Sequence, residues 1–365
     1  MMTRLATPFS ERLGLRLPVI QAPMAGGPSS PELVAAVSGA GALGSFGFAI
    51  TQPDDMKTQV AAVRAKTERP FCINLIVAPQ PAPVDAVHQS AALAALGPWY
   101  AELGLTPPEP ARPPYAPELE AQLAAVAEIR PAVFTAHLGE VNEEWVRRFK
   151  ARGICIGASA TCIAEAERVE ALGFEFVTAQ GGEAGGHRGT YLRDPYEALT
   201  GTLALTRLIV RAVKIPVVAA GGIMDGAGIA AALALGAQGA QLGTAFIPCP
   251  ESGAPEIHKQ AILRAREDDT RITEKFSGKP ARGIANRFLR EAEAKHFPQI
   301  AHPAQNSLTG RLRAASAKAG NPDFYALWAG QAAPLARALP AAELIERLEA
   351  ETIAAIQKVA EFIKE

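Results

Sequence analysis

The chain has 365 residues, of which 48% are hydrophobic, and its formal net charge at pH 7 is −1. This balance can supply a large core, and it excludes the strong positive charge that nucleic-acid or anionic-membrane binding requires. No apolar run reaches the roughly twenty residues that would span a bilayer, so we expect neither a nucleic-acid nor a membrane partner.

The cysteines and the amino terminus indicate a cytoplasmic protein. The four cysteines are Cys72, Cys155, Cys162 and Cys249, and no two have the CxxC spacing of a zinc site. Cys72 and Cys155 lie in apolar runs and are expected to be small core residues. Residues 1–17 contain no secretory signal. We therefore expect a cytoplasmic location and no metal.

Short apolar runs alternate with amphipathic segments through the first 250 residues. The expected strands are 18–22, 43–49, 71–77, 132–138, 154–158, 174–179, 216–220 and 240–246. The expected helices between them are 31–40, 53–66, 117–129, 161–172 and 225–235. Eight strands alternating with helices predict an α/β fold, a (β/α)8 TIM barrel. A doubly wound sheet is the alternative, but it usually has fewer strands.

Two regions depart from this repeat. Residues 78–117 are rich in proline, which removes backbone donors, and predict an insertion that forms a loop on the carboxyl face of the barrel. Trp99 or Tyr100 on this loop would contact substrate, although a passive surface cover fits equally well. The second region follows the barrel and predicts helices at 255–266, 286–295, 308–319 and 341–364. We thus expect a barrel over 1–250 and a mainly helical extension, 251–365, packed on it.

A glycine-rich run, residues 179–189, follows the sixth expected strand. Glycines such as Gly185 and Gly186 leave space for a ligand to approach the backbone. His187 lies in the middle of this run, and imidazole titrates near neutral pH. The pattern predicts an active-site loop with His187 as the catalytic residue. A flexible turn with a surface histidine is the alternative.

Two further glycine sites lie at the ends of the last two expected strands. The pair Gly221-Gly222 ends the seventh strand, and Gln241-Leu242-Gly243-Thr244 lies at the eighth. In barrels the loops after these two strands often bind phosphate through backbone N–H groups. The alternative is tight packing inside the barrel. We favour a phosphate site here.

Polar and small residues at other strand ends fit a flat heterocycle. Ala22-Pro23-Met24 would form a wall after the first strand, unless Met24 is simply a core residue. Asn74 lies inside an apolar run, where an unpartnered amide is costly. It either bonds locally to backbone or, with Gln180, presents donors and acceptors to a ligand such as flavin.

Together with Leu327-Trp328-Ala329-Gly330-Gln331, these motifs resemble the nitronate monooxygenase family over about residues 15–335. The resemblance implies a barrel that binds FMN and oxidises alkyl nitronates, such as propionate 3-nitronate, with O2 to a carbonyl compound and nitrite. It implies His187 as the active-site histidine. The implied cofactor contacts are Ala22, Pro23, Met24, Asn74, Gln180, Gly185, Gly186, Gly221, Gly222, Gln241, Leu242, Gly243 and Thr244.

The segment 305–313 departs from the family pattern, which usually has tyrosine and lysine there; this segment has neither, so the substrate stays open. An NAD(P)H-dependent flavin reductase, acting on quinones or enoyl thioesters, is the alternative on the same barrel. A flavin- or phosphate-binding barrel without enzymatic activity is the third hypothesis. We expect a monomer or a homodimer.

Overall fold

The computed structural model describes residues 5–78 and 84–363. Eight parallel strands form one sheet in the order β1-β9-β8-β6-β5-β4-β3-β2, and a bridge between Ile20 and Leu43 joins its two ends. The strands are β1 (Val19–Gln21), β2 (Gly44–Gly47), β3 (Phe71–Ile76), β4 (Val133–His137), β5 (Cys155–Ala160), β6 (Phe176–Gln180), β8 (Val217–Ala220) and β9 (Gly239–Leu242). The predicted (β/α)8 barrel is confirmed.

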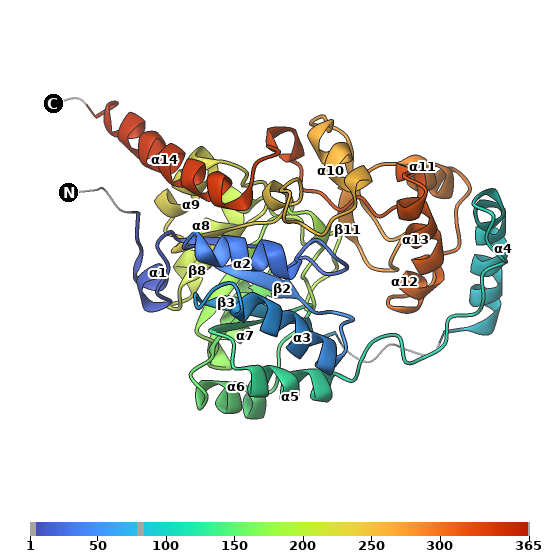
Figure 1. Cartoon of the computed structure of the whole chain (residues 1–365), viewed down its shortest axis with the longest axis horizontal. Helices are drawn as coiled ribbons and strands as arrows, with labels where there is room; N and C mark the ends of the chain where they lie inside the picture. Colours follow the sequence, from blue (N-terminus) through green and yellow to red (C-terminus); the bar gives the residue numbers. More distant parts are fainter. Residues whose placement is uncertain (1–4, 79–83, 364–365) are drawn as a thin grey trace.

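Helices surround this barrel (Figure 1). They are α2 (Pro31–Gly39), α3 (Pro53–Arg64), α5 (Leu119–Ile129), α6 (Glu143–Lys150), α7 (Ile163–Ala171), α8 (Thr202–Ala212), α9 (Gly226–Ala234) and α14 (Ala341–Ala360), with a short α1 (Pro8–Arg12) at the start. Local signals define their starts. Ser30 caps α2 by accepting from the Leu33 N–H, and Asp225 caps α9 by accepting from the Gly228 N–H.

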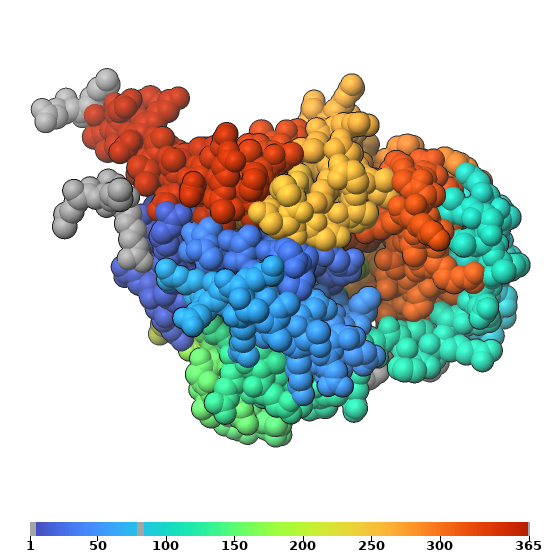
Figure 2. Space-filling view, viewed as in Figure 1, coloured from blue at the N-terminus to red at the C-terminus, as the bar shows by residue number. Residues whose placement is uncertain are grey.

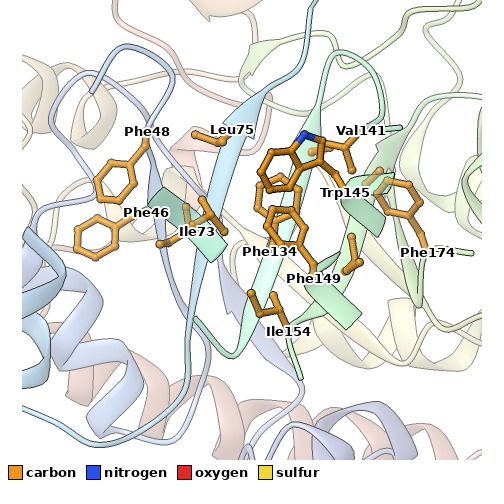
Figure 3. Close-up of a cluster of buried hydrophobic side chains, with 14 of the residues drawn as sticks. Phe46, Phe48, Ile73, Leu75, Phe134, Val141, Trp145, Phe149, Ile154 and Phe174 are labelled. Atoms are coloured by element: carbon orange, nitrogen blue, oxygen red, sulfur yellow. The ribbon is translucent and has the colours of Figure 1, made fainter. Parts of the chain in front are cut away.

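The interior of the barrel is filled by side chains, as expected for eight strands. Phe9 of α1 lies against Phe176, with ring centroids 4.9 Å apart. Cys72 and Cys155 are buried in the same cluster, as predicted. A second cluster packs β2–β5 against α5 and α6, and Figure 3 shows its aromatic rings between strand and helix. This packing fixes the strands whose ends carry the polar residues described below.

The last barrel helix comes from far along the chain. Helix α14 packs against α9 and α2, and the Gly226 N–H donates to Glu351. A Cβ at Gly226 would clash with the backbone of α14, so glycine permits this close approach. About a hundred residues thus leave the barrel after β9 and return to it. Whether 1–250 and 251–365 are separate domains stays a prediction.

The extension contains a small antiparallel sheet that the sequence did not predict. It pairs β10 (Thr270–Thr273) with β11 (Ala281–Ile284), and β11 with β7 (Gly186–His187). The accompanying helices are α10 (Glu256–Leu263), α11 (Arg287–Ala294), α12 (Ala304–Leu308) and α13 (Gly310–Lys318). No helix in the described part of the chain is long and apolar enough to cross a membrane.

The expectation of a loop in the insertion is wrong over α4 (Ala86–Glu102), which is helical; residues 79–83 of the insertion lie outside the described ranges. Pro98 lies inside this helix and removes one N–H donor. Buried contacts of its neighbours compensate. Trp99 packs edge-on against Phe288 at 4.9 Å, and the Tyr100 hydroxyl donates to the Leu308 carbonyl.

Helix α4 therefore lies against the extension (Figure 1), and Figure 2 shows its surface continuous with that of the orange helices α11–α13. Trp99 and Tyr100 are buried within this packing, at 3% and 2% exposure, and they hold α4 in place. These two side chains therefore fit an insertion that only covers the surface, and not one that contacts substrate.

We expect Trp99→Ala to lower the free energy of unfolding by about 3–5 kcal/mol, because it removes a buried ring and leaves a cavity. The Trp99 indole N–H also donates to Glu291, and this bond would be lost. Urea unfolding followed by circular dichroism measures the change. Val87→Ala, on the exposed face of the same helix, should change it by less than about 0.5 kcal/mol. Equal effects of the two changes would show that α4 is not anchored through Trp99.

Candidate functional site

The carboxyl ends of the parallel strands carry a set of polar side chains at one edge of the barrel, where barrel enzymes place their active sites. Asn74 lies on β3, His137 ends β4, and Gln180 ends β6. The turns after β8 and β9 carry the two later glycine sites. The closed parallel sheet therefore brings together residues that are far apart in the sequence.

Asn74 is held by the neighbouring strand. It pairs with Thr135 in register, and its Nδ2 donates to the Thr135 carbonyl at 3.0 Å and to Thr135 Oγ1 at 2.9 Å. Its side chain is 8% exposed. The amide oxygen, Oδ1, accepts no hydrogen bond within the residues described, so it is free to accept an N–H from a ligand.

Gln180 is fixed by the glycine-rich loop that follows it. Its Nε2 donates to the His187 carbonyl at 3.0 Å, and its Oε1 accepts from the Gly189 N–H at 2.7 Å. Arg188, which is completely buried, donates to the same Oε1 and to the Gly181 and Ala198 carbonyls. These bonds set the position of His187 between Gln180 and Arg188.

Most glycines in this loop accommodate the protein's own chain. A Cβ at Gly182 would lie 2.6 Å from the Leu199 oxygen, and one at Gly185 would lie 2.6 Å from the Ala329 carbonyl carbon. At Gly189 it would lie 2.8 Å from the His137 ring. Only Gly186, with a φ of +75°, has open space there among these four. Cofactor contacts of Gly185 and Gly186 stay a prediction.

His187 is partly buried and is not a solvent-facing loop residue. It lies on β7, where it pairs with Ala281 of β11. Its Nε2 is 2.9 Å from Ser277 Oγ, and the Ser277 hydroxyl donates to the Lys279 carbonyl at 3.0 Å. Ser277 must therefore accept from Nε2–H, which leaves Nδ1 as the nitrogen with a free lone pair.

Two further imidazoles accompany His187. The His302 ring lies 5.7 Å from it and the Trp328 ring 5.8 Å, while His137 Nδ1 is 2.7 Å from Ser159 Oγ. Burial lowers the pKa of His187 to about 3 and the pKa values of His137 and His302 to about 4. All three imidazoles are neutral at pH 7.

The two later glycine sites lie side by side, because Ala220 of β8 pairs with Gln241 of β9. The Gly222 N–H makes no hydrogen bond within the described ranges, and its φ of +68° favours glycine. A cavity of about 350 Å³ adjoins the Gly221-Gly222 pair, but it is lined mainly by α8 and α9 and not by Gln241–Thr244. Thr244 begins a short 3₁₀ helix after β9 (Thr244–Phe246), and its Oγ1 accepts from the Gly330 N–H.

The turn after β9 also adjoins the end of β1. A Cβ at Gly243 would lie 3.3 Å from Ala22 Cβ and 3.9 Å from Met24 Sδ. The Gly243 turn is thus bordered by Ala22, Pro23 and Met24, as expected if these residues form one wall of a ligand site. Leu242, in contrast, is buried in the core beside β1. The Gly222 N–H and the Asn74 oxygen, both unpaired within the described residues, thus lie at the carboxyl edge of one barrel. A donor of this kind suits a phosphate, and an acceptor of this kind suits a ring N–H, so these residues fit a phosphorylated flavin.

Sequence reasoning missed His137, Ser277, Lys279 and His302. His137 could have been found as a polar residue ending a predicted strand, like Asn74. The other three come from turns of the extension, where no local pattern marks a site.

The segment 305–313 supports one of those turns. Gln305 Nε2 donates to the Lys275 carbonyl at 2.7 Å, and Thr309 Oγ1 donates to the Phe276 carbonyl at 2.6 Å. It therefore fixes the turn that carries Ser277. Within the described residues, no group of three or more histidine, cysteine, aspartate or glutamate side chains could hold a metal ion.

Comparison with known proteins agrees with this geometry. The model of the nitronate monooxygenase family matches residues 9–351. Nitronate monooxygenases of Paraburkholderia phytofirmans and Pseudomonas aeruginosa are each 43% identical to the chain, covering 96% and 93% of it and 96% and 97% of their own lengths.

Solved structures give the same result. The nitroalkane oxidase of Streptomyces ansochromogenes superposes with a TM-score of 0.89 at 40% identity, covering 96% of this chain and 99% of its own. FabK from Thermotoga maritima superposes with a TM-score of 0.78 at 28% identity, covering 98% of this chain and all of its own.

The neutral imidazoles predict a loss of stability in acid. Between pH 6.5 and 4 an unfolded histidine takes up a proton, whereas His187, with its pKa of about 3, does not. The free energy of unfolding should therefore fall as the pH falls through this window, by at most about 3 kcal/mol for this one group. Urea unfolding at pH 6.5 and 4.5 measures the fall. His187→Asn should make it smaller, and an unchanged fall would mean that His187 is protonated in the folded protein.

Proposed function

The chain belongs to the nitronate monooxygenase family and is a flavin oxidoreductase, and from this we propose that it binds FMN and oxidises alkyl nitronates with O2 to a carbonyl compound and nitrite. Propionate 3-nitronate is the proposed model substrate. One observation carries the proposal: a glycine turn with a free N–H, a free Asn74 oxygen and a neutral His187 share one edge of the barrel.

The proposed cofactor site follows the strand ends. The N–H groups of Gly222, Gly243 and Thr244 would hold the phosphate, and the Thr244 hydroxyl hydrogen would add a donor. Asn74 Oδ1 would accept an N–H of the ring, and Gln180 would face it through its second Nε2 hydrogen. The remaining proposed contacts are Ala22, Pro23, Met24, Gly185, Gly186, Gly221, Gln241 and Leu242. When bound, FMN would take electrons from the nitronate and pass them to O2.

His187 would act as a proton acceptor through Nδ1. Its Nε2–H is engaged by Ser277, so the ring is held in one tautomer with the Nδ1 lone pair free. A preformed nitronate has already lost its α-proton and needs no base. A neutral nitroalkane does need one, and a nitrogen with a pKa of about 3 is unprotonated at pH 7 but weakly basic. We therefore expect nitronates to be the better substrates.

The cofactor site is tested at Gly243. Gly243→Asp should weaken FMN binding by at least about tenfold, because it places a carboxylate beside the phosphate. Gly243→Ala is the matched control: its Cβ would meet only Ala22 and Met24 at ordinary or slightly short contact, so it should cost much less. Fluorescence titration of the flavin-free protein with FMN measures both. Equal losses in the two variants would attribute the effect to bulk and place the phosphate elsewhere.

The base is tested with matched substrates. His187→Asn should slow oxidation of a neutral nitroalkane by about 10²–10⁴-fold, the usual scale for loss of a general base, and should change the rate with its nitronate much less. Steady-state O2 consumption measures both rates. Equal losses on both forms would assign His187 to substrate binding. Anaerobic reduction of the bound flavin by NAD(P)H, and not by nitronate, would instead favour the reductase alternative.

A further inference from the structure

The turn between β10 and β11 delivers Lys279 to the edge of the site. The Ser277 hydroxyl that engages His187 donates to the Lys279 carbonyl. The next residue, Pro280, accepts from the Arg188 N–H at 2.9 Å, and Ala281 then pairs with His187. Residues that precede and follow Lys279 are thus held against β7, the strand that carries His187.

The ammonium group of Lys279 is unpaired in the part of the chain that the structure describes. Its side chain is partly buried, yet within residues 5–78 and 84–363 its Nζ makes no hydrogen bond or ion pair. Lys275 of the same turn differs, because its Nζ donates to the Phe297 carbonyl and to Gln299. An ammonium group that no protein acceptor engages, at the edge of a site, is available to bind an anionic ligand.

The charge of Lys279 is felt across the site. It contributes to the lowered pKa values of His137, His187 and His302, so all three imidazoles lie within range of it. The carboxylates that act on Lys279 are Glu165 and Glu274, and burial outweighs both and lowers its pKa.

Neither carboxylate forms an ion pair with Lys279 within residues 5–78 and 84–363. Glu165 instead accepts from Thr161, Thr190, Tyr191 and Leu192, and Glu274 accepts from Gln299. Since the imidazoles are neutral, they add no charge but can add N–H donors. The cluster is therefore suited to a carboxylate.

We propose that Lys279 is a specificity-determining residue that binds the carboxylate of a nitronate carrying a second negative charge. The inference rests on the proposed function. The turn that carries Lys279 contacts His187 at Nε2, through Ser277. The reacting end of the substrate would bind at the other ring nitrogen, the free Nδ1. A substrate with one anionic group at each end can occupy both places. The His302 ring lies beside His187, with 5.7 Å between the ring centroids.

Two substrates that differ only in the second anion test this assignment. Propionate 3-nitronate carries a carboxylate where propyl-1-nitronate carries a methyl group. Lys279→Met should lower kcat/KM for propionate 3-nitronate by about 10–100-fold, mainly through KM, because it removes a charge-assisted contact. For propyl-1-nitronate the change should stay below about threefold. Lys279→Arg keeps the charge and should restore most of the loss.

Lys275→Met is the matched control, since it removes a lysine from the same turn that already has partners; it should leave the ratio of the two substrates unchanged. Equal loss on both nitronates, or no loss on either, would overturn the assignment.

Binding without turnover separates this inference from the proposed function. The dissociation constant of 3-nitropropionate, measured by calorimetry with the flavin-loaded protein, should rise about tenfold in Lys279→Met. If the wild type oxidises neither nitronate but this rise is found, the proposed function fails and the carboxylate site stands. If the wild type oxidises both and the constant does not change, the function stands and the inference fails.

Discussion

The pairing of β7 with β11 is the interaction on which the site depends. Only two residues of β7 take part, Gly186 and His187, yet they join the barrel loop to a hairpin nearly a hundred residues away. Arg282 of β11 reinforces the contact by donating to the Gly182 carbonyl. Without this pairing the loop after β6 would keep its bonds to Gln180 and Arg188, but Ser277 and Lys279 would not lie beside His187. A sheet of three short strands thus joins this loop to the turn that carries Ser277 and Lys279.

Burial then sets the protonation states of the side chains that this loop positions. Withdrawal from water keeps the imidazoles neutral and lowers the pKa of Lys279, which forms no ion pair among the described residues. A neutral imidazole beside an unpaired ammonium provides a lone pair and a positive charge at separate atoms. An anionic substrate that needs little base assistance suits such a site better than a neutral one. Electrostatics therefore agrees with the family to which the chain belongs.

The sequence predicted the barrel because its strands are apolar on both faces and end at turn residues, as in the run that contains Asn74. It also predicted that Gly221-Gly222 and Gln241–Thr244 would meet, since neighbouring parallel strands end at one edge. It failed at α4, where buried contacts of Trp99 outweigh Pro98. It could not find Ser277, Lys279 or His302, because only tertiary pairing brings these turns to the barrel. The predicted cofactor residues stay predictions.

One segment links the two ends of the site. The Trp328 ring faces His187, Ala329 backs Gly185, and the Gly330 N–H donates to Thr244 at the glycine turn. The imidazole end and the proposed phosphate end are thus braced by three consecutive residues. From there the chain returns to the barrel, where α14 packs against α9. The extension is therefore held by the barrel at both of its ends, and the turn that carries Lys279 keeps its place although it lies outside the barrel sheet.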